Sequence, residues 1–194
     1  MKTLILGTKN RDKLREIREI LLDVPLRLEP LPEGTPTSPE ETGTIEGNAV
    51  QKAVNYAEHV GTWCLADDTG LEVDALDGAP GVDAALYAGP DATYADNRDK
   101  LLAALEGQAV RTARFRCVMA LANPAGEVLA TAEGTLEGEI TTSAAGEGGF
   151  GYDPIFRPLG ETKTLAEISA DDKNRLSHRG AALRALEPRL LELL

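Results

Sequence analysis

The sequence predicts an α/β fold built on a mixed sheet. Amphipathic helical patterns occur towards both ends of the chain, and a hairpin pattern lies in its middle. Together these patterns favour a mixed sheet over a purely parallel one. The chain has 194 residues, 42% of them hydrophobic, with no internal repeat and no interdomain linker. We therefore expect a single domain over residues 1–194.

Strands and helices alternate in the first third of the chain. Leu14, Ile17 and Leu21 fall on one helical stripe, which predicts an amphipathic helix beginning near Asn10. Residues 30–43 are rich in Pro, Thr, Gly and Glu and predict a mobile loop. The other elements expected here are a strand at 3–6, a strand near 26–28, a helix at about 46–59 and a strand at 62–66.

A hairpin and a helical tail are expected in the rest of the chain. Residues 113–121 alternate in the manner of a half-buried strand. The turn at 123–126 leads into a return strand at 128–136. We also expect an irregular segment at 74–91, a helix at 93–105, a glycine-rich loop at 143–153 and a largely helical tail at 172–194, in which Pro188 opens a last short segment.

The charge of the chain limits its partners. It has 32 acidic and 20 basic residues and a formal net charge of −12, so its long-range field repels nucleic acids and anionic membranes. A small anion can still bind in a local basic pocket or through a metal. No segment has the ~20 apolar residues of a membrane span. Cys64 and Cys117 lack metal-binding spacing, so we expect two buried reduced thiols in a cytoplasmic protein.

The first candidate site residues lie between Gly7 and Lys13. A glycine after a strand and directly before a helix suits phosphate, because the first helical turn presents free N–H groups. Thr8 and Asn10 can donate hydrogen bonds, and Lys13 adds a positive charge. The spacing is not that of a Walker A loop. The alternative is that Asn10 only caps the helix and that Lys9 and Lys13 are solvated.

Two adjacent carboxylates, Asp67 and Asp68, follow the strand expected at 62–66. Mg²⁺ binds carboxylates, water and substrate phosphate, and two like charges side by side are costly without a cation nearby. Ligands also gather at strand ends in open α/β sheets. Glu40, in the loop ahead of the next helix, would complete a metal site with Asp68. The alternative is an Asx turn with solvated carboxylates.

A glycine-rich segment, GEGGFGYDP at 146–154, surrounds one aromatic ring. Its backbone can approach a ligand closely, and Phe150 offers a face for stacking. Asp153 precedes a proline and is biased towards an extended conformation. The alternative is a flexible surface loop with Phe150 in the core.

Lys173, His178 and Arg179 form the most obvious local anion pocket of this acidic chain. The alternative is a solvated basic face near the C-terminus. Taken together, the four segments supply phosphate contacts, carboxylates, a stacking ring and basic side chains. That set suits a nucleoside triphosphate with Mg²⁺.

In the order of these motifs the sequence resembles the inosine triphosphate pyrophosphatase family, most closely its bacterial branch. Members of that family hydrolyse non-standard purine nucleotides (dITP, ITP and XTP) to the monophosphate and pyrophosphate. The chain departs from the family pattern at Lys9, Ile45 and Gly47, without losing a polar group that the chemistry needs. The matching stretches cover nearly the whole chain: TKNRDKLREI at 8–17, EETGTIEGNAVQKA at 40–53, ADDTGLEVDALDGAPGV at 66–82, RFRCVMAL at 114–121, GEGGFGYDPIF at 146–156 and LSHRGAAL at 176–183.

The resemblance implies an elongated two-lobed α/β fold around a long mixed β-sheet with flanking helices, and an active site in the cleft between the lobes. It also implies a homodimer, Mg²⁺ as the cofactor, and metal binding by Glu40 and Asp68. Asp68 would be the general base, and Asp67 either an alternative ligand or an orienting residue. The substrate-binding residues that it implies are Thr8, Lys9, Asn10 and Lys13 for the phosphates, Thr69 for a further substrate contact, Phe150, Gly151, Tyr152 and Asp153 for the base, and Lys173, His178 and Arg179 closing on the nucleotide.

These assignments predict a mechanism and a selectivity. Asp68 takes the proton from a water that attacks the α-phosphorus, and Lys13 with its helix N-terminus offsets the charge of the leaving pyrophosphate. Asp68→Asn should then lower kcat by orders of magnitude with little change in folding. His178 and Arg179, as donors, should favour the 6-oxo group of hypoxanthine and xanthine over the 6-amino group of adenine. Such a buried mismatch costs about 1–3 kcal/mol.

Two alternatives remain open on the sequence. One is a related pyrophosphatase that acts on modified pyrimidine nucleotides, as Maf-like proteins do; the FGYD and SHR motifs favour the purine substrate. The other is a regulatory module that binds nucleotides without chemistry. The presence of Glu40 and Asp68 speaks against it, because a sensor does not need a carboxylate that activates water.

Overall fold

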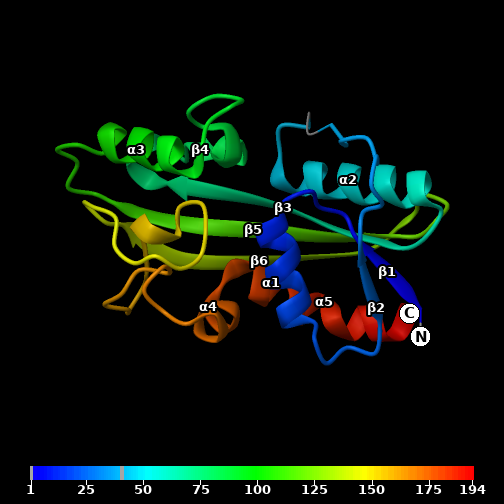
Figure 1. Ribbon diagram of the computed structural model, residues 1–194. Helices are drawn as coiled ribbons and strands as arrows, with labels where there is room; N and C mark the ends of the chain where they lie inside the picture. Colours follow the sequence, from blue (N-terminus) through cyan, green and yellow to red (C-terminus); the bar gives the residue numbers. More distant parts are fainter. Residues whose placement is uncertain (1, 40–41) are drawn as a thin grey trace. The chain divides into compact units, whose positions relative to one another are not determined.

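The computed structural model describes residues 2–39 and 42–194 (Figure 1). Within these residues the strands form one seven-stranded sheet, in the order β2-β1-β3-β5-β6-β7 with β4 paired to β3. The chain divides into two compact units. Unit 1 comprises Met1–Asp68, Cys117–Gly134 and His178–Leu194, and unit 2 comprises Thr69–Arg116 and Thr135–Ser177. The predicted α/β fold with a mixed sheet is confirmed.

Unit 1 begins with parallel strands. β1 (Thr3–Leu6) pairs in parallel with β2 (Arg27–Pro30) on one side and with β3 (Cys64–Val73) on the other. The first two strands lie where the apolar pattern predicted them. Gly7 follows β1 and packs closely on the sheet, since a Cβ there would lie within 3.1 Å of Cys64, Ala66 and Tyr56.

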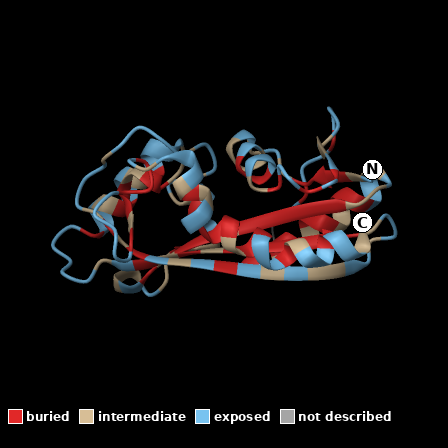
Figure 2. Ribbon diagram, turned by 90° about the horizontal axis from the view of Figure 1, so that it is seen from below, coloured by how far each residue is buried: buried red, intermediate tan, exposed pale blue. Residues whose placement is uncertain are grey.

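Helices cover both faces of the strands in unit 1 (Figure 1). α1 (Arg11–Ile20) and α5 (His178–Leu193) pack on one face, and α2 (Ile45–Val60) packs on the other. Buried residues are concentrated in the strands, whereas the helices expose their outer sides (Figure 2). The core between the sheet and the α1–α5 layer contains Leu4, Leu6, Ile17, Leu21, Val24, Leu26, Leu65, Cys117, Met119, Leu121, Ala182, Leu183, Leu186 and Leu190.

The predicted hairpin is formed by two long strands that contribute residues to both units. β5 (Thr112–Ala122) and β6 (Val128–Ile140) are neighbours in the sheet, and the turn at Asn123 and Gly126 joins them. β5 alternates in burial only in its first part. Its last residues, from Cys117 to Ala122, are all buried, because helices cover both faces of the sheet in unit 1. The prediction of a half-buried strand is therefore right for one part of β5.

Unit 2 contains short elements around its own core. The segment expected to be irregular holds two 3₁₀ turns, η1 (Asp74–Leu76) and η2 (Val82–Leu86), with the two-residue strand β4 (Pro80–Gly81) between them. The other elements are α3 (Tyr94–Ala104), η3 (Asp153–Ile155), β7 (Phe156–Pro158), which pairs antiparallel with β6, and α4 (Ala170–Leu176). The core contains Leu71, Val73, Ala84, Leu101, Leu105, Ala113, Phe115, Ile140, Tyr152, Ile155, Phe156 and Leu165.

The tail breaks at a different residue from the one predicted. Ser177 has an extended backbone (ψ 154°), which ends α4 before α5 begins at His178. Pro188 lies inside α5 instead of opening a new segment. A proline inside a helix removes one hydrogen bond and crowds the preceding turn, which is why a break is expected there, but α5 continues through Pro188 to Leu193.

Two further expectations concern the thiols and the membrane. Cys64 and Cys117 are both buried and free, as predicted. Among the helices of residues 2–39 and 42–194, none is long and apolar enough to cross a membrane.

Candidate active site

The two adjacent aspartates lie inside a strand, not in a turn after it. β3 runs through Asp67 and Asp68 to Val73, so the expected strand end at residue 66 is wrong. β1 pairs with β3 only as far as Leu65, which places both aspartates just past the carboxyl end of this parallel pair. Ligands gather at such ends in α/β sheets. The two aspartates thus lie in a strand instead of the predicted turn, and their role in a site stays a prediction.

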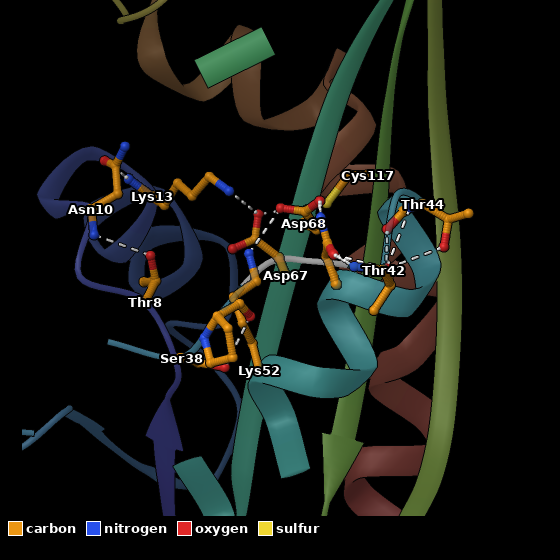
Figure 3. A network of polar contacts seen from close by, with 12 residues as sticks. Thr8, Asn10, Lys13, Ser38, Thr42, Thr44, Lys52, Asp67, Asp68 and Cys117 are labelled. Carbon is orange, nitrogen blue, oxygen red and sulfur yellow. Dashed lines mark hydrogen bonds and ion pairs between the residues drawn. The ribbon is translucent and has the colours of Figure 1, made fainter. Parts of the chain in front are cut away.

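Successive side chains of a strand point to opposite faces of the sheet. Asp67 accordingly faces α1 and α5, where Lys13 and Arg179 contact it. Asp68 faces α2, where Lys52 contacts it (Figure 3). The two neighbouring carboxylates therefore contact different partners on opposite faces of the sheet.

Asp68 is 5% exposed, and α2 supplies a partner to each of its oxygens. Lys52 Nζ donates to Oδ1 at 2.8 Å, and Asn48 Nδ2 donates to Oδ2 at 3.3 Å. Lys52 and Asn48 are one helical turn apart and lie on the same face of α2. An ionised carboxylate has about four acceptor sites. Asp68 can therefore take a proton or coordinate a cation while both contacts hold it in place.

Asp67 is 1% exposed and is held by two cations. Lys13 Nζ lies 3.0 Å and Arg179 Nη2 lies 3.2 Å from its Oδ2. Burial alone would raise the pKa of Asp67, but Lys13, Arg179 and Lys52 together hold that pKa well below its usual range. Asp67 therefore stays ionised and connects β3 to α1 and α5.

Arg179 is 2% exposed and also donates through Nη1 to Glu16 on α1. Burial would lower the pKa of Arg179, but Asp67 and Glu16 raise it. Three carboxylates thus face three cations, so the like charges on adjacent aspartates are compensated by the protein itself. We call this set the β3 cluster; it comprises Lys13, Glu16, Lys52, Asp67, Asp68 and Arg179.

The segment between β1 and α1 is ordered around its helix cap. Asn10 Oδ1 accepts hydrogen bonds from two backbone N–H groups in the first turn of α1, and the N–H of Asn10 donates to Thr8 Oγ1 at 3.1 Å (Figure 3). The capping role considered for Asn10 is confirmed. Lys9 Nζ donates to Thr37 Oγ1 at 3.0 Å, whereas Lys13 reaches the β3 cluster. Phosphate binding by these four residues stays a prediction.

The predicted metal partner of Asp68, Glu40, lies outside the described residues. Close to it in sequence, Thr42 is described, and its N–H donates to Asn48 Oδ1 on α2. Within residues 2–39 and 42–194, no group of three or more His, Cys, Asp or Glu side chains could hold a metal ion. The pairing of Glu40 with Asp68 therefore stays a prediction.

The aromatic ring of the glycine-rich segment lies in unit 2 and is half-buried. The N–H of Phe150 donates to Asp153 Oδ2 at 2.7 Å, and Lys173 on α4 pairs with the same carboxylate. Lys173 Nζ also lies over the Phe150 ring, 4.6 Å from its centroid. The ring of Tyr94, on α3, lies 5.8 Å from that of Phe150. Phe150 is thus held between a cation and a second ring.

The two residues after Phe150 have different surroundings. The carbonyl of Gly151 accepts a hydrogen bond from Arg98 Nη1 at 2.9 Å, which joins this segment to α3. Tyr152 belongs to the core of unit 2, its hydroxyl donates to the Ala84 carbonyl at 2.7 Å, and burial raises its pKa. A contribution of Gly151 and Tyr152 to base binding stays a prediction.

The three basic residues expected in one pocket are divided between the two units. Lys173 pairs with Asp153 in unit 2, whereas Arg179 pairs with Glu16 and Asp67 in unit 1. His178 is the buried first residue of α5, in unit 1. Thr69 is the next residue of β3 after Asp68 and belongs to unit 2. The substrate contacts of His178, Arg179 and Thr69 stay predictions.

Sequence reasoning missed several members of these networks. Asn48 and Lys52 directly precede Ala49 and Ala53, which form part of the buried stripe of α2. Polar side chains one turn apart beside that buried stripe are a signal that could have identified them. Glu16 next to Ile17 on α1 gives the same signal. The sequence around Arg98 carries no such signal, because Arg98 donates to a backbone carbonyl, which any residue can supply.

The profile of the Ham1 family matches residues 4–189, nearly the whole chain. The chain belongs to the Ham1 family. Proteins named dITP/XTP pyrophosphatase are similar to this chain along most of their length. The protein from Syntrophobacter fumaroxidans is 48% identical over 95% of this chain and 80% of its own, and that from Exiguobacterium is 48% identical over 97% and 96%. The resemblance inferred from the motifs is confirmed.

Solved structures of Ham1 proteins have the same fold. The HAM1 protein from Coxiella burnetii is 41% identical and superimposes with a TM-score of 0.89 over 99% of this chain and 100% of its own. The Ham1 protein from Staphylococcus aureus is 34% identical, with a TM-score of 0.86 over 99% and 100%. This Ham1 chain is thus matched over nearly its full length in sequence and in structure.

Proposed function

We propose that this Ham1 protein hydrolyses non-standard purine nucleoside triphosphates (dITP, ITP and XTP) to the monophosphate and pyrophosphate, and so removes them from the nucleotide pool. The observation that carries the proposal is Asp68, a buried carboxylate held from both oxygens just past the end of a parallel strand pair. The names of the relatives supply the substrate class.

Asp68 has the features of a general base. It carries its negative charge beside Lys52, and two hydrogen bonds fix its orientation, so it can accept a proton from a water at a defined position. Lys13 lies on the first turn of α1, whose N–H groups and partial positive charge suit phosphate oxygens. We propose that Lys13 and this helix start bind the phosphates and offset the charge of the leaving pyrophosphate.

We propose Mg²⁺ as the cofactor, bound by Asp68 and Glu40. The donor set fits, because Mg²⁺ prefers one or two carboxylates together with water and phosphate oxygens. The three carboxylates and three cations of the β3 cluster balance one another without the ion. The net charge of the chain would repel a negatively charged magnesium–nucleotide complex, but this balanced cluster does not. When bound, the ion would neutralise charge on the phosphates.

For the base, we propose stacking on Phe150. The ring is held by Tyr94 and Lys173, and a held ring loses less freedom when a purine stacks on it. Stacking does not distinguish purines. The proposed donors to the 6-oxo group are His178 and Arg179. Arg179 already donates hydrogen bonds to Glu16 and Asp67. To donate to the 6-oxo group of the base, it would have to release one of these carboxylates or donate to both acceptors at once.

We further propose that the protein is a homodimer and acts in the cytoplasm, where its substrates would arise. Light scattering coupled to size-exclusion chromatography tests the dimer: a mass near twice 20.6 kDa is expected, and a monomer at all concentrations would contradict it.

The experiment that tests the proposed function is pyrophosphate release from a panel of nucleoside triphosphates with Mg²⁺, with EDTA as the control. We expect fast, metal-dependent release from ITP, dITP and XTP and far slower release from ATP and GTP. Release of single phosphates, or a preference for modified pyrimidines, would contradict the substrate assignment. Tight nucleotide binding without turnover would favour the regulatory module.

A further inference from the structure

Two residues on one face of α3 contact the glycine-rich segment that carries Phe150. Arg98 Nη1 donates to the Gly151 carbonyl at 2.9 Å. The ring of Tyr94 lies 5.8 Å from that of Phe150, with the two planes tilted by 45°. Tyr94 and Arg98 are four residues apart in the sequence, so they are neighbours along the helix surface. All four residues belong to unit 2.

α3 is itself fixed to the rest of unit 2. Leu101, three residues after Arg98, is fully buried in the core of this unit. Asn97 is 2% exposed, and its carboxamide accepts from the Ala88 N–H at 2.7 Å and donates to the Ala85 carbonyl at 3.0 Å. The two contacts with the glycine-rich segment therefore come from a helix that is held in place, which is a precise support for a binding site.

The composition of the glycine-rich segment makes such support necessary. Residues 146–151 include four glycines, and glycine loses more conformational freedom on folding than any other residue. Gly151 has a φ of +62°, a left-handed conformation that glycine adopts without strain. A segment of this kind needs contacts from outside to keep one conformation. Arg98 supplies one at the carbonyl of the residue directly after Phe150.

The other contacts of Phe150 involve charged side chains. Its N–H donates to Asp153 Oδ2 at 2.7 Å, and Lys173 Nζ lies 4.6 Å from the centroid of its ring. Asp153 and Lys173 are themselves expected to contact the nucleotide, so their contacts with Phe150 can change when it binds. Arg98 instead donates to a main-chain carbonyl, and this contact can persist while the base is bound.

We propose that Arg98 and Tyr94 are positioning residues of the base pocket, which hold the backbone at Gly151 and the ring of Phe150 ready for the purine. This inference rests on the proposed function. Arg98 acts on the backbone and Tyr94 on the ring, so neither has to touch the nucleotide. A pocket that is held before binding loses less freedom when the base enters, so the effect falls on substrate binding and not on the chemical step.

The test compares Arg98→Met with Lys100→Met as a matched control. Lys100 is also on α3, and its Nζ donates to a backbone carbonyl as well, that of Tyr87 at 2.5 Å. Both substitutions remove a cation and keep an unbranched side chain. Of the two cations, Arg98 contacts the glycine-rich segment and Lys100 contacts the residue that follows η2.

Three quantities separate positioning of the base from a general loss of structure. The first is the pair of kcat and KM values with ITP. The second is kcat/KM with ribose 5′-triphosphate, which has the same phosphates and no base. The third is hydrogen exchange of the Phe150 amide without nucleotide or metal, because this amide donates to Asp153 in the held conformation.

For Arg98→Met we expect a KM for ITP that is raised about fivefold or more, with kcat changed by less than about twofold. Turnover of the base-free triphosphate should also change by less than about twofold, while the Phe150 amide should exchange about fivefold faster or more. Arg98→Lys keeps a donor and should recover part of the loss. Lys100→Met should change none of these quantities by more than about twofold.

Tyr94 supplies a second and independent pair of variants. Tyr94→Leu removes the ring beside Phe150 and should raise the KM for ITP about threefold or more. Tyr94→Phe keeps the ring and should raise KM by less than Tyr94→Leu does. Tyr94 is 41% exposed, so these variants test the inference even if Arg98→Met does not fold.

If Arg98→Met has the same KM for ITP as Lys100→Met, the inference is overturned while the proposed function stands. Equal losses with ITP and with the base-free triphosphate would show that Arg98 is only structural, and would overturn the inference as well. If the wild-type protein does not turn over ITP, the proposed function fails. Exchange of the Phe150 amide that is unchanged in Arg98→Met would then overturn the positioning role itself, and faster exchange would support it.

Discussion

Asp67 and Asp68 are adjacent in sequence but are held by different partners. Asp67 is 1% exposed and bound to Lys13 and Arg179, whereas Asp68 is bound to Lys52 and Asn48. Alternation along β3 separates them, so one carboxylate connects helices to the sheet and the other is available for the proposed chemistry. The choice between ligand and orienting residue for Asp67 stays a prediction; we favour the orienting role, because two cations contact its Oδ2.

This difference predicts opposite phenotypes for the same substitution at neighbouring positions. Asp67→Asn leaves Lys13 and Arg179 without their shared counter-ion, and breaking a buried pair in this way typically costs about 3–5 kcal/mol. Asp68→Asn should cost less stability, but more than the sequence alone suggested, because Lys52 is also buried. Its kcat should fall at least about 100-fold, as loss of a general base does.

Urea unfolding and pyrophosphate release from ITP, measured on both variants, check this prediction. Normal turnover by Asp68→Asn, or wild-type stability of Asp67→Asn, would contradict these assignments.

The Cys64 thiol gives the stability a defined pH dependence. Burial raises the pKa of Cys64 to about 12, whereas a thiol in the unfolded chain titrates near ~8.5. Above that value the unfolded state loses a proton that the folded state keeps, so stability falls as the pH rises. Between pH 7 and pH 9.5 the free energy of unfolding should drop by about 1.4 kcal/mol from this group.

Urea unfolding of the wild type and of Cys64→Ala at both pH values measures this contribution, with Cys117 present in both as an internal control. The pH-dependent loss should be about 1.4 kcal/mol smaller in the variant. Equal losses would show that the thiol does not keep its proton in the folded state.

At the scale of elements, the close packing of α5 on β6 places Arg179. Gly134 of β6 lies against the backbone of His178 and Ala182, and a Cβ there would overlap both. The glycine therefore permits the first turn of α5 to approach the sheet. That turn carries Arg179 to Glu16 and Asp67.

Gly134→Ala should consequently displace the first turn of α5. Overpacking of this kind costs about 1–3 kcal/mol, and kcat should fall because Arg179 no longer holds Asp67 in place. Thr131→Ala, at an exposed position of the same strand, serves as the control and should change stability by less than about 0.5 kcal/mol. Thermal unfolding and ITP turnover measure both; a Gly134→Ala protein as stable and active as the control would contradict the packing argument.

Sequence patterns predicted most elements and failed where tertiary pairing decides. β1 and the hairpin followed from apolar runs, alternation and turn residues. β3 was cut short because two aspartates are typical of a turn, whereas here cations on both faces of the sheet let the strand continue. The sequence at Ser177 does not predict the end of a helix, although α4 ends there. Pro188 predicts a break in the helical tail, although α5 continues through it.

Sequence patterns indicate candidate residues of the site but not their arrangement. Asp68, Lys13 and Phe150 are candidates because carboxylates, lysines and aromatic rings in glycine-rich segments carry recognisable chemistry. Which cation meets which carboxylate depends on contacts between residues far apart in the chain, such as Glu16 with Arg179, and no local pattern contains them.

At the scale of the whole molecule, a chain of net charge −12 contains a balanced cluster at the proposed phosphate site. Three carboxylates there are matched by three cations from three helices. The repulsive field therefore acts at long range and not at the site itself. The family and the fold are matched along nearly the entire chain. On this fold, we propose that Asp68 activates the water that attacks the α-phosphorus.

The most direct test is hydrolysis of ITP with Mg²⁺ in ¹⁸O-labelled water, followed by mass spectrometry of both products. Attack at the α-phosphorus predicts one ¹⁸O atom in the inosine monophosphate and none in the pyrophosphate, and it predicts that Asp68→Asn slows the appearance of label. Label in the pyrophosphate, or in released single phosphate, would place the attack on another phosphorus and contradict the account.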